Sequence, residues 1–170
     1  MDGLALLDVR YGGDDARCAC VVADGWTSEL PTLEFTVDTH GVAPYRSGAF
    51  FERELPSLVA AVDELERRAA DVGCLVVDGY VFLDADARPG LGWHLWHHYG
   101  GRYAVVGIAK TAFSGNASAV PVTRGRSIRP LFVTAIGVDA LEIADTVRRM
   151  PGPHRLPTLV ARADRLSRAC

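Results

Sequence analysis

Three acidic residues of the chain stand in apolar surroundings, where a carboxylate is unusual. Asp8 interrupts the apolar run "LALLDV", Asp78 ends the apolar run "CLVV", and Glu54 falls among apolar residues at helical spacing. A buried carboxylate costs free energy unless it is paired or bound to a metal ion. Brought together, the three would repel one another, and a divalent cation with oxygen ligands would remove that repulsion. Such a cation can activate water and neutralise a phosphodiester during in-line displacement.

Each of these carboxylates also has a simpler structural explanation. Asp8 could belong to a strand whose second face is in water. Glu54 could lie at the edge of the apolar stripe of its helix, or interact with the first helical turn. Asp78, which precedes Gly79, could be a turn residue that bonds its own backbone. Ligands of α/β proteins nevertheless gather at the carboxyl ends of strands, where Asp78 is expected.

The hydrophobic pattern predicts an α/β protein with a single domain over residues 1–170. Apolar runs predict strands at 4–11, 17–24, 33–38, 74–84, 102–110 and 129–137. Helical spacing predicts helices at 51–65, 90–100, 138–150 and 157–168. Three early strands followed by alternating strands and helices imply a mixed sheet. In this sheet an antiparallel three-strand meander precedes parallel strands, and helices cover both faces.

The composition is that of an ordinary globular protein, with 49% hydrophobic residues among 170. No apolar stretch approaches the ~20 residues of a membrane helix, so a cytoplasmic protein without a membrane partner is expected. Cys18 and Cys20 stand two apart in a predicted strand, so reduced thiols are expected. Residues 1–99 carry a net charge of -10 and residues 100–170 a net charge of +7. This asymmetry fits either an ordinary surface or a basic face beside an acidic, nucleic-acid-cutting site.

At the three carboxylates the chain resembles a known family, endonuclease V, whose members nick DNA at deoxyinosine and have a ribonuclease H-like fold. The similarity runs in order along nearly the whole chain. The matching segments are "LLDVRY" around Asp8, "PYRSGAFFERELP" around Glu54, "LVVDG" around Asp78 and "VVGIAK" ending at Lys110. Two C-terminal segments, "RPLFVTAIG" and "HRLPTLVARAD", are weaker matches. The resemblance implies one endonuclease V-like domain.

The resemblance also implies a mechanism that uses a divalent cation. Asp8 and Asp78 would bind Mg²⁺, with Mn²⁺ as a substitute, and Glu54 would complete the acidic cluster directly or through water. The enzyme would cut the second phosphodiester on the 3′ side of deoxyinosine in DNA repair, leaving 3′-hydroxyl and 5′-phosphate ends. Inosine-containing DNA is therefore the expected partner, and the protein is expected to act as a monomer.

Other residues are assigned to substrate binding by the same resemblance. A loop of Tyr45, Arg46, Ser47 and Gly48 would act as a wedge that separates the lesion from its partner base. Lys110, the only lysine of the chain, would face a phosphate. The remaining substrate-binding positions are Gly79, Tyr80 and Gly107. The two glycines would let the backbone approach the base or its phosphate closely.

The chain departs from the family pattern at several positions. Ser47 replaces the second proline of the wedge, and "YVFLDADARPG" replaces the segment that lines the inosine pocket, where Asp84 could add an acidic group. Asp164 stands where the family has an active-site histidine and is counted among the predicted catalytic residues. Gly137-Val138 replaces a Gly-His pair. Two alternatives therefore stay open: a nuclease with structured RNA or another altered substrate, and an inactive homologue that binds nucleic acid or protein.

Two further segments could bind ligands. The helix "WHLWHH" spaces His94, His97 and His98 three and four apart, which can suit zinc, but a partly exposed aromatic helix face is the simpler explanation. The three arginines of "RGRSIRP", residues 124–130, could contact phosphates or lie in a solvated loop.

Overall fold

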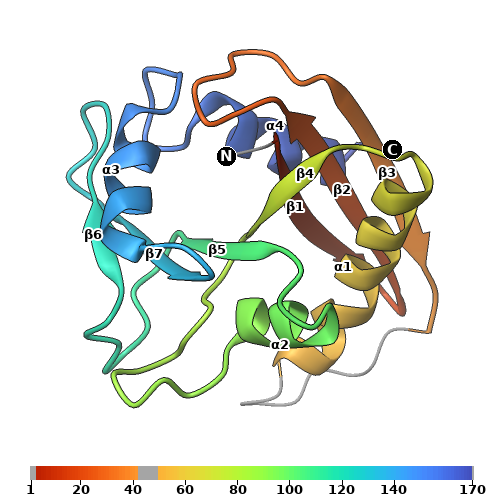
Figure 1. The fold of residues 1–170 in the computed structure, drawn as a ribbon, viewed down its shortest axis with the longest axis horizontal. Coiled ribbons are helices and arrows are strands. Elements are labelled where there is room, and N and C mark those ends of the chain that lie inside the picture. Colours follow the sequence, from red (N-terminus) through yellow and green to blue (C-terminus); the bar gives the residue numbers. More distant parts are fainter. Residues whose placement is uncertain (1–2, 42–49, 170) are drawn as a thin grey trace.

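The computed structural model describes residues 3–41 and 50–169, which form one seven-stranded mixed sheet with helices (Figure 1). The strands lie in the order β3-β2-β1-β4-β5-β7-β6. Their bounds are β1 Gly3–Gly12, β2 Asp15–Ala23, β3 Leu33–Thr39, β4 Val72–Val77, β5 Ala104–Ala109, β6 Val120–Val122 and β7 Leu131–Ile136. The helices are α1 Phe50–Arg67, α2 Leu91–His98, α3 Ala140–Arg149 and α4 Thr158–Ser167. The predicted α/β class is confirmed.

The strands β1, β2 and β3 form the predicted antiparallel meander, and β1, β4 and β5 are parallel neighbours. The prediction of parallel strands is wrong at the far edge of the sheet. There β7 pairs antiparallel with β5, and β6 pairs antiparallel with β7. The sequence pattern does not predict β6, because this strand has only three residues with Pro121 at its centre, and proline cannot donate to a ladder.

The two faces of the sheet carry different helices, because side chains alternate along each strand. Leu4 and Leu6 of β1 point into the core that α3 and α4 cover. Ala5 and Leu7 point into the opposite core, which α1 and α2 cover. Figure 1 shows α1 and α2 on a different side of the sheet from α3 and α4. The prediction of helices on both faces is confirmed.

The strand β4 is shorter than predicted, since it ends at Val77 and does not continue through 74–84. Gly79 has a φ of +152°, a conformation that favours glycine, and here the chain leaves the sheet. Val81 is buried beyond this turn, and its N–H donates to Thr134 Oγ1 at 2.8 Å. The apolar residues after the turn pack beneath α2, which explains why they resemble a continuing strand in the sequence.

The thiols of Cys18, Cys20 and Cys74 are free and buried, as predicted for the first two. They pack as small apolar groups, and burial raises the pKa of the Cys20 thiol to about 12. Among the described helices, none has the length and apolar character needed to cross a membrane.

Candidate active site

Three neighbouring parallel strands bring Asp8, Asp78 and Lys110 to one side of the sheet. Asp8 lies within β1, whereas Asp78 and Lys110 directly follow the last residues of β4 and β5. Leu7 of β1 is level with Val77 of β4, so the acidic residue that follows each of them is a neighbour of the other. The residues two positions before the two aspartates and the lysine all lie in the core that α4 covers. Because side chains alternate along a strand, all three polar side chains point toward α4.

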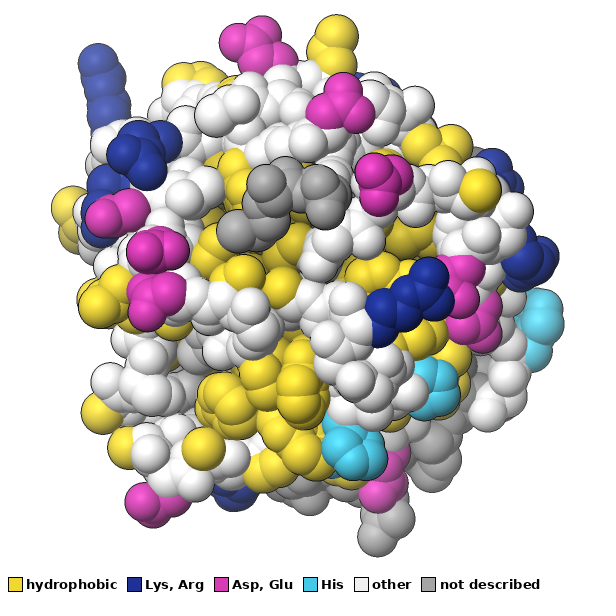
Figure 2. Space-filling view, viewed as in Figure 1, with side chains coloured by type: hydrophobic (Ala, Val, Ile, Leu, Met, Phe, Trp, Pro, Cys, Tyr) yellow, Lys and Arg dark blue, Asp and Glu magenta, His cyan; other side chains and the backbone are white. Residues whose placement is uncertain are grey.

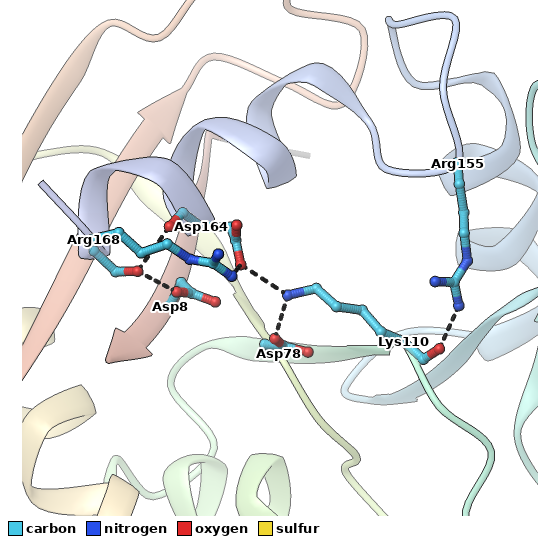
Figure 3. Close-up of polar contacts among 7 residues, drawn as sticks. Asp8, Asp78, Lys110, Arg155, Asp164 and Arg168 are labelled. Atoms are coloured by element: carbon cyan, nitrogen blue, oxygen red, sulfur yellow. Dashed lines mark hydrogen bonds and ion pairs between the residues drawn. The ribbon is translucent and has the colours of Figure 1, made fainter. Parts of the chain in front are cut away.

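The Lys110 ammonium lies at the centre of an ion-pair network (Figure 3). Its Nζ donates to Asp78 Oδ2 at 2.7 Å and to Asp164 Oδ1 at 3.2 Å. Arg168 Nη2 donates to the same oxygen of Asp164 at 2.8 Å. Burial lowers the pKa of Lys110, but the hydrogen bond and charge of Asp78, the charge of Asp8 and the hydrogen bond to Asp164 together outweigh burial and raise the pKa overall. At neutral pH Lys110 is therefore a cation that offsets the surrounding carboxylates.

Ser167, which sequence reasoning missed, fixes the orientation of Asp8. Its hydroxyl lies 2.6 Å from Asp8 Oδ2 and 2.9 Å from the carbonyl oxygen of Asp164. A hydroxyl has one proton, and the shorter bond to a carboxylate is the stronger of the two. Burial raises the pKa of Asp8, the bond from Ser167 lowers it, and the charge of Asp78 raises it, so that the net pKa is raised. No signal in the sequence marks Ser167, because a serine three residues after an aspartate is ordinary on a helix face.

Glu54 lies on the buried face of α1, as its helical spacing predicts, with 8% of the residue exposed. Burial is the main cause that raises its pKa from 4.5 to about 8, and the charges of Asp78 and Asp8 raise it further. Interactions with Tyr11 and Arg53 offset part of this increase. The three predicted carboxylates also line one cavity, so the fold brings them to the same place.

A cavity of about 510 Å³ opens beside these groups, a volume within the range of small-molecule sites. Its polar lining consists of Asp8, Glu54, Asp78, Lys110 and Thr111, with the Tyr80 side chain. Apolar and aromatic side chains also line the cavity, among them Leu58, Tyr80, Leu91 and Phe113. Figure 2 shows hydrophobic side chains gathered on the surface beside α2 and β5, with histidine side chains at the margin.

Tyr80 shapes the apolar lining of this cavity. Its hydroxyl donates to the carbonyl oxygen of Thr111 at 2.6 Å and accepts from the N–H of Phe113 at 3.1 Å. Burial raises the pKa of Tyr80, and the bond from Phe113 offsets only part of that increase. Since the hydroxyl is used by the backbone, Tyr80 offers its ring to the cavity.

Gly107 and Asp84 have structural roles. A Cβ on Gly107 would collide with the carbonyl oxygen of Gly79 and lie 2.8 Å from Thr134 Oγ1. The space at this glycine is thus filled by the turn after β4. Asp84 Oδ1 accepts hydrogen bonds from two backbone N–H groups of the following loop, at 3.1 and 3.0 Å. The side chain of Asp84 therefore stabilises its own loop.

The predicted wedge loop and Gly79 were both assigned to substrate binding, but the structure describes only Gly79. The wedge residues 45–48 lie outside the described residues, and their role stays a prediction. Gly79 follows Asp78 at the site, where an added Cβ would contact only Leu91 Cδ2, at 3.8 Å. Glycine is required at position 79 by the positive φ of the backbone and not by crowding.

Arg124 is not available to a phosphate, contrary to one interpretation of its segment. It is only 6% exposed, and it donates to five backbone carbonyl groups between residues 148 and 155. Arg124 therefore stabilises the connection between α3 and α4. Arg126 and Arg129 are exposed.

The histidines of α2 form an aromatic surface. His94 stacks on Phe51 with ring centroids 3.7 Å apart, and His97 stacks on Trp93 at 4.8 Å. Within residues 3–41 and 50–169, no three His, Cys, Asp or Glu side chains are grouped so that they could hold a metal ion. The simpler explanation of "WHLWHH" is thus the better one.

The same finding bears on Asp8, Asp78 and Glu54, which do not form a direct three-ligand set in the described structure. Mg²⁺, however, commonly uses one or two protein carboxylates, keeps several waters and takes further oxygens from substrate phosphates. Asp8 and Asp78 are adjacent oxygen donors that repel each other. This pair fits such an ion, because a bound cation would relieve their repulsion.

No model of a protein family matches the chain, and no curated protein matches it in sequence. Solved structures do match. An endonuclease V from Bacillus subtilis superposes with a TM-score of 0.79, covering 99% of this chain and 80% of its own, at 21% sequence identity. The chain has the endonuclease V fold.

Other solved structures are similar to the chain as well. The catalytic domain of human endonuclease V has a TM-score of 0.79 at 24% identity, over 99% of this chain and 81% of its own. Endonuclease V from Ciona intestinalis, in complex with a DNA that contains an inosine followed by a ribo-adenosine, has a TM-score of 0.79 at 17% identity, over 98% and 84%. An Argonaute from Marinitoga piezophila, bound to a guide RNA, has a TM-score of 0.60 at 9% identity, over 99% and 30%. The ribonuclease H-like prediction is confirmed by the endonuclease V fold.

Proposed function

We propose that the protein is a divalent-cation-dependent endonuclease that nicks inosine-containing DNA at the second phosphodiester 3′ to the lesion. The observation that carries the proposal is the position of Asp8 within β1, beside Asp78 at the carboxyl end of β4 and the Lys110 ammonium. The endonuclease V fold supports it, and so does the human structure named as a catalytic domain. The Ciona structure supports DNA as the partner, because that enzyme was solved with an inosine-containing strand.

Asp8 and Asp78 would hold Mg²⁺, or Mn²⁺ in its place. Bound there, the ion would supply an activated water and neutralise charge on the phosphodiester. Ser167 would keep Asp8 Oδ2 occupied, so that Asp8 turns its other oxygen toward the cavity. Glu54 would hold the attacking water from the α1 side. Cleavage would leave 3′-hydroxyl and 5′-phosphate ends.

Lys110 would bind the phosphate that is cut. In the structure it donates to two carboxylates, and an incoming phosphate oxygen would replace Asp78 as its acceptor. Asp164, which also binds Arg168, would retain Lys110 at the site during this exchange. Asp164 thus holds a cation in place, a role that needs only a carboxylate.

The cavity of about 510 Å³ would receive the extruded base. Its aromatic lining, with Tyr80 and Phe113, suits stacking with a base of any identity. The Tyr80 hydroxyl cannot read the base edge, because it is bonded to backbone groups. This observation favours a second candidate function, a nuclease of the same fold with relaxed base specificity or with RNA as substrate.

One assay separates these functions. The protein is incubated with Mg²⁺ or Mn²⁺ and end-labelled DNA or RNA that carries a single inosine, with matched strands that lack it. We expect nicking at the second bond 3′ to inosine, abolished by EDTA and by Asp78→Asn but not by Asp86→Asn, an exposed aspartate outside the site. Equal nicking without inosine would favour the second candidate. No cation-dependent nicking of any strand would refute both and favour the inactive binding homologue.

The proposal keeps two expectations about the state of the protein. It would act as a monomer, which sedimentation at working concentration would check. It would work in the cytoplasm, which fractionation of cells that express a tagged form would check.

A further inference from the structure

A second, polar cavity leads away from the acidic cluster between the end of β1 and the end of α4. It has a volume of about 340 Å³ and shares Asp8, Asp78 and Lys110 with the first. A third cavity of about 380 Å³ continues it over β2, and the two have Arg10 and Arg168 in common. A continuous polar track thus runs from the candidate cutting site past two arginines.

Arg10 is an exposed cation of this track. It follows Asp8 by two residues on β1, so both side chains leave the same face of the sheet, about 6.8 Å apart along the strand. The Arg10 guanidinium makes no hydrogen bond or ion pair with any residue in the part of the chain that the structure describes. The other arginine shared by the two cavities, Arg168, is already bonded to Asp164.

The pairing of β1 with β2 makes this position electrostatically unfavourable. Arg10 lies directly opposite Arg17, and like charges at directly opposed positions destabilise a sheet. Arg17 is neutralised by Asp38, with Nε 2.6 Å from Oδ1 and Nη2 2.9 Å from Oδ2. An anion at Arg10 would relieve the remaining repulsion.

We infer that Arg10 binds the nucleic-acid phosphate that neighbours the one held at Asp8 and Asp78. A nucleic-acid strand carries phosphates in series, so a strand with one phosphate at the acidic cluster must place the next one a few ångströms away. Arg10, two residues after Asp8 on the same face and within the same polar track, offers a cation that carries no carboxylate of its own. The inference rests on the proposed function, and it adds a direction: the strand passes over the end of β1 beside α4.

The test measures binding of a fluorescent single-stranded DNA in EDTA, where no cation-dependent cutting occurs, over a range of salt concentrations. Arg10→Ala should weaken binding about three- to tenfold at low salt and reduce the slope of log affinity against log salt by about 0.7, the value for one phosphate contact on a single strand. Arg10→Lys should keep the slope, and Arg10→Glu should weaken binding further. The matched control is Arg149→Ala, an exposed arginine of α3, which should leave affinity and slope unchanged.

Several results would overturn the inference. An Arg10→Ala protein that binds and nicks like the wild type would remove the subsite while leaving the proposed function intact. A wild type that binds no nucleic acid and nicks none would remove both. Equal competition by polyglutamate would reassign the track to an acidic protein. The unfolding temperature of Arg10→Ala should be unchanged or higher, because the repulsion with Arg17 is lost, so weaker binding cannot be ascribed to unfolding.

Discussion

Glu54 should make the protein less stable as the pH rises from about 5 to 8. The pKa of its carboxyl is about 8 in the folded protein and 4.5 as the ordinary value. Between these values the folded state binds more protons than the unfolded state, so the free energy of unfolding falls with rising pH. Each unit by which the two pKa values differ corresponds to about 1.4 kcal/mol. The loss should therefore total about 4–5 kcal/mol above pH 8.

The substitution Glu54→Gln removes the ionisable group and keeps most of its volume. At pH 5 the variant should be about as stable as the wild type, because both side chains are neutral there. At pH 8.5 it should be more stable by up to about 4 kcal/mol, reduced by any bond to Tyr11 or Arg53 that the amide makes less well. Urea denaturation in EDTA at pH 5, 6, 7, 8 and 8.5 measures both proteins, and Glu29→Gln, an exposed glutamate, is the control.

The pKa of Asp8 is also raised, but both proteins contain Asp8. The difference between their unfolding free energies therefore reports on Glu54 alone. Excess Mg²⁺ should make the unfolding free energy of the wild type fall less between pH 5 and 8.5. A cation at Asp8 and Asp78 would offset the charges that repel Glu54. A difference in unfolding free energy that stays constant from pH 5 to 8.5 would refute the reasoning, because it would mean that Glu54 ionises as it does in water.

Three further predictions concern stability and positioning. Ser167→Ala removes the hydrogen bond to Asp8 and should lower the nicking rate at saturating DNA about tenfold, equivalent to about 1.4 kcal/mol. Single-turnover assays measure this rate, and Ser167→Thr, which keeps the hydroxyl, should restore it. Gly107→Ala should reduce the unfolding free energy by about 1–3 kcal/mol through crowding, while Gly25→Ala, where a Cβ meets nothing within 4 Å, should change it little. Arg124→Ala removes the donor of five backbone carbonyl groups, of which that of Met150 is buried, and should cost at least about 2 kcal/mol in thermal or urea unfolding.

The sequence was a good guide wherever one element carries its own periodicity. The first three strands and all four helices were predicted within a few residues, because alternation and helical spacing are local properties of the chain. The pattern failed after Asp78, where apolar residues that pack beneath α2 resemble a continuing strand. It also failed at β6, which is too short to show a period.

The candidate site was predicted in part. The anomalous positions of Asp8, Glu54 and Asp78 marked them as functional candidates before any contact was known. Ser167 was missed, since a serine in a helix has no unusual property until the residue that it bonds is seen. Arg10 was missed for the same reason, because an arginine in a strand becomes unusual only when it faces another arginine across the sheet.

The sequence by itself determined the kinds of element, their order and the identity of the carboxylates, since these depend on residue type and spacing along the chain. The tertiary structure alone decided which charges meet. The pairing of Lys110 with Asp78 joins residues 32 apart in sequence, and that of Ser167 with Asp8 joins residues 159 apart. Such contacts depend on strand order and register, which are fixed by packing over the whole sheet. The chemistry of the site is therefore encoded locally, and its geometry is a property of the complete fold.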